Sequence, residues 1–324
     1  MSDHLLTDET AVQEDKSFKR SLGLLDGTMI VAGSMIGSGI FIVSADITRN
    51  VGSTGWLIVV WLLTGFMTIT AALSYGELSG MFPKAGGQYV YLKEAYNPLI
   101  GFLYGWSFFA VIQTATIAAV GVAFAKFTAY LLPVFSETKV AIDLGFRTIS
   151  PAQLLSIVII VLLSYINTKG IRNGKIIQTT FTLTKLLSLF GLIVFGLFMT
   201  KSNVWSANWS NAWNLHKLNT DGSIAAYTSA AALGAIAAAM VGSIFSSDAW
   251  NNVTFIAGEI KNPSRNIGLS LFLGTLIVTL IYVTANIMYT AVLPLHEIAT
   301  ADRDRVAVSA SNAIFGNAGT IVIA

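Results

Sequence analysis

The sequence predicts an all-α protein that crosses a membrane several times, and its composition is the first evidence. Hydrophobic residues make up 54% of the 324 residues, while charged residues make up 11%, less than half of the share usual in soluble domains. The mean hydropathy is +0.68. So few charges cannot cover the surface of a soluble protein of this size, whereas helices that face lipid need almost none.

A polar start is followed by apolar segments, each long enough to cross a hydrocarbon core of ~30 Å. Residues 1–20 predict a cytosolic tail, because they lack the early apolar stretch and small-residue cleavage site of a secretory signal. The predicted spans are residues 22–44, 55–80, 98–131, 151–168, 176–200, 226–258 and 266–293, with an eighth that begins near residue 306.

The distribution of positive charge predicts the orientation. With the N-terminus inside, ten Lys and Arg residues lie in the inner connections and seven in the outer ones, and the last two of the 19, Lys126 and Lys185, lie within spans. This favours a cytoplasmic N-terminus in a multi-pass protein of the cell (inner) membrane. Trp56 and Trp61, at the start of the second span, are predicted to be interface anchors. Because residues 320–324 stop partway through the eighth span, we expect the chain to be a fragment of a longer polypeptide.

The first span contains a glycine-rich run, GSMIGSGIF, at residues 33–41. Glycine disfavours helix by about 1 kcal/mol relative to alanine. One interpretation is a small-residue packing face, since Gly33 and Gly37 are four residues apart. The other is an unwound segment at residues 37–39, near the bilayer midplane, where irregular backbone is tolerated only if it lines a cavity.

The sixth span contains a second candidate break, GSIFSSDAWNN, at residues 242–252. Asp248 lies eleven residues before Glu259, which corresponds to a depth of about 16 Å along a helix. An intramembrane carboxylate is costly unless it faces water or a partner. Asp248 is therefore expected either to face a polar space or to cap a broken helix end, and both roles imply a break.

Breaks in the first and sixth spans predict two repeats of five spans with inverted topology, an arrangement in which half-helix ends converge on a midplane site. Residues 21–200 would form the first repeat, and residues 201–324 would form part of the second.

Three segments carry a resemblance to a known family: GSGIF (37–41), YGELSGMFPKAGGQYVYL (75–92) and DAWNNVTFIAGEIKNPSRNI (248–267). With them the sequence resembles the amino acid–polyamine–organocation superfamily, and within it bacterial permeases related to the L-type amino-acid exchangers. The likeness runs from about residue 20 to the end. It implies a LeuT-like fold of two five-span inverted repeats, truncated here in about the eighth helix, and amino-acid transport by alternating access.

The resemblance places the substrate-binding groups on the main chain of both breaks. The substrate carboxylate would accept hydrogen bonds from N–H groups at the positive end of the second half of span one. The ammonium would lie against carbonyl groups at the opposite helix ends. The residues implied in these roles are Gly37, Ser38 and Gly39 for the carboxylate, and Met35, Phe245 and Asp248 for the ammonium.

Side-chain selectivity would then come from residues around the second break. The Phe245 ring matches an aromatic that closes over the substrate in relatives, and Asn251 could add a polar contact, whereas Trp250 is expected to pack. The run Ser246-Ser247-Asp248-Ala249 stands where the L-type exchangers tend to have Ala-Tyr-Gly-Gly. The extra carboxylate could favour a small polar or cationic substrate, so the substrate class stays open beyond an amino acid.

Lys185 lies about 15 Å along the fifth span after Lys175, too deep to reach the headgroups easily. By resemblance it occupies the place where sodium-coupled relatives hold a cation, and its ammonium could bond carbonyls near Met35. A fixed positive charge there would repel Na⁺. We expect sodium-independent transport, by exchange if Lys185 stays protonated and by proton symport if it deprotonates in one state.

Other function classes lack their sequence signals. A net charge of +2 gives no case for nucleic-acid binding. The sequence contains neither the HExxH nor the GxSxG motif, so it gives no support for an enzyme. A channel would need a continuous polar stripe, and no span has one. No cofactor or metal is expected, because the chain has no cysteine and only three histidines. The expected partners are an amino acid substrate and membrane lipid. Light-chain relatives tether a heavy subunit by a disulfide in the loop after span three. No such disulfide is expected here, because the loop at 132–150 has no cysteine.

Overall fold

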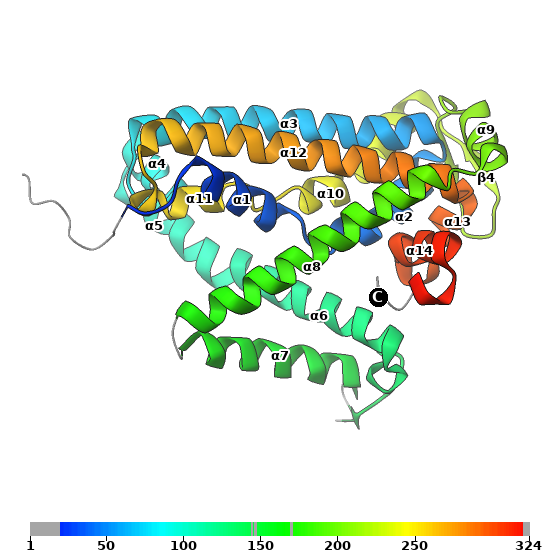
Figure 1. The fold of residues 1–324 in the computed structure, drawn as a ribbon, viewed down its shortest axis with the longest axis horizontal. Coiled ribbons are helices and arrows are strands. Elements are labelled where there is room, and N and C mark those ends of the chain that lie inside the picture. Colours follow the sequence, from blue (N-terminus) through cyan, green and yellow to red (C-terminus); the bar gives the residue numbers. More distant parts are fainter. Residues whose placement is uncertain (1–19, 144, 146–147, 169–170, 320–324) are drawn as a thin grey trace, which may run out of the picture.

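The computed structural model describes residues 20–143, 145, 148–168 and 171–319, so the predicted tail up to residue 19 and the chain end at 320–324 lie outside the described residues. The chain folds into a helical bundle (Figure 1). Its helices are α1 Leu24–Met35, α2 Gly39–Val51, α3 Thr54–Met81, α4 Gln88–Ala95, α5 Pro98–Ser107, the π-helical segment η1 Phe108–Gln113, α6 Thr114–Leu131, the 3-10 turn η2 Pro133–Phe135, α7 Pro151–Thr168, α8 Ile171–Phe198, α9 Ser202–Ser210, α10 Ser229–Ser246, α11 Asn252–Phe255, the 3-10 turn η3 Ala257–Glu259, α12 Pro263–Val292, α13 Leu295–Ala299, the 3-10 turn η4 Asp302–Asp304 and α14 Val306–Phe315.

Two short antiparallel hairpins lie in the connections between these helices. In the first, β1 (Ile142–Asp143) pairs with β2 (Thr148–Ile149). In the second, β3 (His216–Leu218) pairs with β4 (Ile224–Ala226), next to α9 at one end of the bundle (Figure 1).

Several helices of the described chain are long and apolar enough to cross a membrane. Four stretches qualify by themselves, namely α3, the continuous run from α5 to α6, α10 and α12. The count rises to six if each of two bent pairs forms one span: α1 with α2, bent by 50°, and residues 183–198 of α8 with α9, bent by 93°. The apolar helices α7 and α14 are shorter. The prediction of an all-α polytopic membrane protein is confirmed at this level.

Helices α3 and α12 lie side by side along most of their length, at the upper edge of the view in Figure 1. A Cβ atom built on Gly76 would lie 3.0 Å from the Cα atom of Gly268, so the two backbones touch there. Trp61 of α3 is only 1% exposed, and its ring packs edge-on against Tyr282 of α12 at 5.1 Å. The prediction that Trp61 anchors the membrane interface is wrong, because this side chain lies on the face of α3 that packs against α12.

The first span is longer than predicted, since α2 continues to Val51 instead of ending near residue 44. The helix ends where Gly52 adopts a left-handed conformation with φ of +64°. The additional turns carry Arg49, whose guanidinium bonds the carboxylate of Asp304 at 2.6 Å and the carbonyl of Ala299 at 2.9 Å. These contacts tie the end of α2 to the segment between α13 and α14.

At the opposite end of the bundle, the chain before α1 pairs with the segment after α11. The N–H groups of Ser21 and Leu22 donate to the carbonyl of Glu259, and the N–H of Lys261 donates to the carbonyl of Leu22. Three backbone hydrogen bonds therefore connect the start of the first span to the end of the sixth.

Candidate functional site

Both predicted helix breaks are present, and they touch each other. The first break separates α1, which ends at Met35, from α2, which begins at Gly39. The second lies between α10, which ends at Ser246, and α11, which begins at Asn252. A Cβ atom on Gly39 would lie 3.1 Å from the Cα atom of Ser246, so two residues predicted for the site from distant parts of the sequence are neighbours.

Local sequence explains why the helices stop at these points. At the first break, Gly37, Ser38 and Gly39 are weak helix formers, and the preceding Ile36 turns into an extended conformation with ψ of 91°. At the second, the N–H of Ser247 closes the last turn of α10, and Ala249 then adopts φ of +68°. The left-handed backbone conformation costs an alanine roughly 1–2 kcal/mol, so the surrounding packing must hold this turn in place.

The hydroxyl group of Tyr282 joins the two breaks. This residue of α12 is 1% exposed, and its hydroxyl lies 3.0 Å from the carbonyl oxygen of Met35 and 3.1 Å from that of Ser246. Each of the two carbonyl groups has two lone pairs, so one on each remains for another donor. Tyr282 is not among the site residues expected from the sequence, and the only local signal for it is a tyrosine in the middle of an apolar span.

The backbone of the first break borders open space at Gly37. Gly37 is exposed, and the nearest atom to a Cβ built on it is the Met35 carbonyl oxygen at 4.0 Å. In the described part of the chain, the N–H groups of Gly37 and Ser38 donate to no backbone carbonyl, and the first bond of the α2 turn runs from Phe41 to Ser38. The start of α2 thus combines available N–H groups with the positive end of a helix dipole.

Lys185 reaches the first break from α8. Its ammonium donates a hydrogen bond of 3.1 Å to the carbonyl of Gly33, in the last turn of α1. The acceptor, Gly33, lies two residues before Met35, and the sequence predicts a bond to carbonyl groups near Met35. The side chain is partly buried, and no carboxylate among the described residues forms an ion pair with it.

The other predicted residues surround the second break. The Phe245 side chain is 59% exposed, and Asp248 is also exposed. Asp248 does not cap α11, because the N-cap position is Asn251, which makes no side-chain capping bond. The predicted packing role of Trp250 is confirmed by its edge-on contact with the Tyr75 ring at 4.9 Å.

A cavity of about 240 Å³ lies next to Trp250 on the side of α4. Burial raises the pKa of Tyr91 in its wall to about 12, so this hydroxyl stays neutral. The lining residues are Tyr75, Leu78, Gln88, Tyr91, Leu92, Ala95 and Tyr104.

Two interrupted apolar helices whose broken ends meet are typical of the polytopic membrane proteins that carry small solutes. Comparison with known proteins agrees with this class. The family model described as amino acid permease matches residues 22–324. The chain belongs to this family, within the amino acid–polyamine–organocation superfamily, and membership places it among transporters rather than enzymes.

Curated relatives come from the same group of transporters. The chain is 31% identical to the human "Large neutral amino acids transporter small subunit 2" over 281 residues, which cover 86% of this chain and 48% of that protein. It is 29% identical to the "b(0,+)-type amino acid transporter 1" of Oryctolagus cuniculus over 293 residues, which cover 88% of this chain and 55% of that protein. The chain thus spans about half the length of the curated relatives it matches.

Proposed function

We propose that the full-length protein moves amino acids across the cell membrane by alternating access, and that it holds the substrate zwitterion with main-chain groups of the two breaks. The observation that carries this proposal is the contact between the breaks at Gly39 and Ser246. The substrate carboxylate would bind the N–H groups of residues 37–39, at the positive end of α2. The ammonium would bind the carbonyl groups left at the ends of α1 and α10.

The carbonyl groups proposed for the ammonium lie at the negative ends of two helix dipoles. Met35 and Ser246 each keep one lone pair beside the Tyr282 hydroxyl. The carbonyl groups of Phe245 and Asp248 belong to the same turn. Tyr282 would fix the distance between the two acceptors, so that the pocket fits an amine and a carboxylate on one carbon atom.

The proposed architecture is a LeuT-like fold of inverted repeats, with residues 21–200 in the first repeat and residues 201–324 in part of the second. Support comes from the breaks, which fall in the first and sixth spans as such a fold requires. The Lys and Arg distribution supports a cytoplasmic N-terminus. In this orientation the end of the bundle that carries α13 and α14 faces the outside, because α2 ends there (Figure 1).

Transport is proposed to be sodium-independent exchange. The ammonium of Lys185, bonded to Gly33, places a fixed positive charge beside the first break, where it would repel a sodium ion. One observation favours proton symport as a second candidate: Lys185 has no carboxylate partner among the described residues, so loss of its proton would leave no buried anion behind.

Selectivity among amino acids is proposed to depend on the side chains of the second break. Asp248 is exposed there and makes no ion pair in the described part of the chain, so it would favour a small polar or cationic substrate. Phe245 would cover the bound substrate, and Asn251 would add a polar contact. A heavy subunit, if there is one, would not be tethered by a disulfide in the loop after α6, because residues 132–150 contain no cysteine.

Purified full-length protein in liposomes tests these proposals. Uptake is measured for each of the labelled proteinogenic amino acids, with and without unlabelled amino acid inside the liposomes, and with and without sodium and proton gradients. Exchange predicts saturable uptake that requires amino acid inside the liposomes and does not depend on the sodium gradient. Uptake driven by a proton gradient into empty liposomes would instead support symport. Uptake that rises linearly with concentration would indicate a channel, and uptake no faster than in protein-free liposomes would reject the proposal.

A further inference from the structure

Helices α6 and α7 form a groove at the edge of the bundle. The two helices pack against each other and run in opposite directions, and α7 lies outermost (Figure 1). Two cavities, of about 350 Å³ and 340 Å³, lie along this pair, each within the usual range of about 300–1,000 Å³ for small-molecule sites. Val122, Gln153 and Ser156 line both of them, so the two cavities adjoin and together form the α6–α7 groove.

The first of these cavities is apolar, although two polar side chains belong to its lining. The Ser156 hydroxyl bonds the carbonyl of Gly121 at 2.9 Å, and the side-chain oxygen of Gln153 accepts from the N–H of Ser150 at 2.9 Å. Both side chains are thus bonded to backbone, and the rest of the wall is hydrocarbon. The lining residues are Ala118, Val122, Ile149, Gln153, Ser156, Ile157 and Ile160.

Close approach of the two helices forms the floor of the apolar cavity. A Cβ atom built on Gly121 would lie 2.9 Å from the Cδ1 atom of Ile160, so the small residue lets α6 approach α7. Val122 and Ile157 flank this contact and are exposed. The apolar cavity is therefore open on the side that faces away from the helix pair.

The second cavity is polar and charged. Glu137 forms an ion pair with Lys126 of α6 at 3.8 Å. Lys139 is exposed and forms no ion pair with another described residue. These three charges sum to +1, so the polar cavity attracts an anion. The lining residues are Val122, Glu137, Thr138, Lys139, Val140, Thr148, Ser150, Ala152, Gln153 and Ser156.

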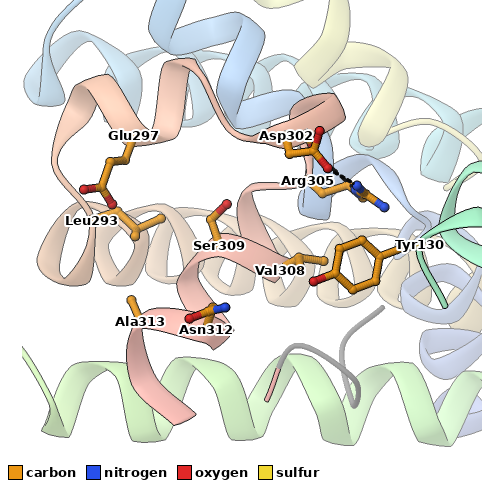
Figure 2. Close-up of a pocket in the computed structure, with 9 residues that line it drawn as sticks. All are labelled: Tyr130, Leu293, Glu297, Asp302, Arg305, Val308, Ser309, Asn312 and Ala313. Atoms are coloured by element: carbon orange, nitrogen blue, oxygen red, sulfur yellow. Dashed lines mark hydrogen bonds and ion pairs between the residues drawn. The ribbon is translucent and has the colours of Figure 1, made fainter. Parts of the chain in front are cut away.

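The charges of a larger cavity, of about 460 Å³ at the α13–α14 end, are arranged differently (Figure 2). There the guanidinium of Arg305 is buried, pairs with the carboxylate of Asp302 and lies 4.4 Å from the centroid of the Tyr130 ring. This cation is already paired and covered, whereas the ammonium of Lys139 is open to a ligand. Because Tyr130 belongs to the last turn of α6, the polar cavity lies toward the same end of the bundle as α13 and α14.

The two cavities follow the order of polarity in one leaflet of a membrane. The apolar run from α5 to α6, which is long enough to cross a membrane, ends at Leu131, and the polar cavity is lined by the chain that follows. Ala118, in the apolar cavity, lies 13 residues before Leu131, or about 20 Å along the helix. One leaflet of a hydrocarbon core of ~30 Å is about 15 Å thick. The groove therefore extends from the level of the headgroups to the depth of the acyl chains.

We propose that the α6–α7 groove binds one anionic phospholipid of the surrounding membrane. An acyl chain packs between Val122 and Ile157, and the headgroup phosphate binds the ammonium of Lys139, beside the hydroxyl groups of Thr148 and Ser150. A free anion would leave the apolar cavity unfilled, and an apolar helix of a partner would bring no negative charge to Lys139. The inference does not depend on which solute the protein carries.

Native mass spectrometry of the delipidated full-length protein in detergent tests the proposal. The probes are dioleoyl phosphatidylglycerol, which is anionic, and dioleoyl phosphatidylcholine, which is zwitterionic. The wild-type protein is expected to bind one phosphatidylglycerol more tightly than any further one. The expected preference over phosphatidylcholine at this first step is about fivefold, because one lysine near an anionic lipid contributes about that factor.

Two pairs of variants with matched controls locate the lipid. Val122→Trp fills the groove and should weaken the first binding step at least about tenfold. Val120→Trp makes the same change on the same helix, at an exposed position outside both cavities, and should leave that step unchanged. Lys139→Gln should remove the preference for phosphatidylglycerol. Lys217→Gln, which removes the same charge from an exposed position in β3, should not.

Three results would overturn the inference. Equal binding of both lipids by the wild-type protein and by Lys139→Gln would show that the headgroup is not held at this lysine. Equal effects of Val122→Trp and Val120→Trp would place the lipid outside the groove. A second copy of the chain that displaces the lipid, and whose binding Val122→Trp prevents, would assign the groove to a protein contact instead. The proposed transport of amino acids would stand in each case, since liposome uptake tests it separately.

Discussion

Replacing Gly39 with alanine would test whether the two breaks must touch. The added Cβ would lie 2.1 Å from the Oγ atom of Ser246 and 3.1 Å from its Cα atom. Carbon atoms in contact prefer about 3.5–4.0 Å, so α2 and α10 must move apart by roughly 0.4–0.9 Å even if the serine side chain turns away. Overpacking of this kind costs about 1–3 kcal/mol. We expect a lower unfolding temperature and, because a shift near 1 Å misplaces the binding groups, a loss of up to about 100-fold in exchange rate.

Two variants separate this reasoning from a general defect. Gly37→Ala adds the same methyl group two residues away, where the nearest atom is 4.0 Å distant, so it should leave the unfolding temperature unchanged and weaken only substrate binding. Ser246→Gly, added to the Gly39→Ala protein, removes the Oγ and Cβ atoms that the new methyl group meets, so it should restore part of the lost stability. The measurements are tryptophan-monitored unfolding and initial exchange rates in liposomes. If Gly39→Ala unfolds and transports like the wild-type protein, the breaks do not pack as described.

The other predictions concern the groups around the breaks. Tyr282→Phe removes the hydroxyl that bonds Met35 and Ser246, and because two buried carbonyl groups lose a donor, stability should fall by about 1–3 kcal/mol and substrate affinity with it; equal affinity would show that the hydroxyl does not position the acceptors. Lys185→Ala should reduce exchange or make it sodium-dependent, and transport rates that match the wild-type protein at every pH and sodium concentration would exclude the residue from coupling. Ala249→Gly should raise stability by about 1 kcal/mol, because glycine tolerates the left-handed conformation found there, and an unchanged unfolding temperature would mean that the turn is not strained.

The positions of the breaks could be predicted from the sequence, because helix-breaking residues act locally. Gly37 and Gly39 weaken the first span. The polar run around Asp248 interrupts the sixth span within a few residues of the observed end of α10. The predicted end of the first span, residue 44, lies seven residues before the observed end of α2, because Arg49 and its neighbours are polar yet remain helical through contacts with a distant segment.

Packing between spans could not be predicted, because a helix that is apolar on all sides gives no signal of which face is buried. Trp61 lies near the start of the second span, where tryptophan often anchors the membrane interface, yet its side chain lies in the core against Tyr282. The hydroxyl of Tyr282 bonds Met35, 247 positions away in the chain, and no local pattern reveals such a partner. The same applies to the contact between Gly39 and Ser246.

A structure of the full-length protein with a transported amino acid bound would show whether main-chain groups hold the substrate. We expect the substrate carboxylate to lie about 2.7–3.2 Å from the backbone nitrogen atoms of residues 37–39, and its ammonium at similar distances from the carbonyl oxygens that end α1 and α10. A carboxylate bound to the Lys185 ammonium, with those backbone nitrogen atoms facing water, would contradict it.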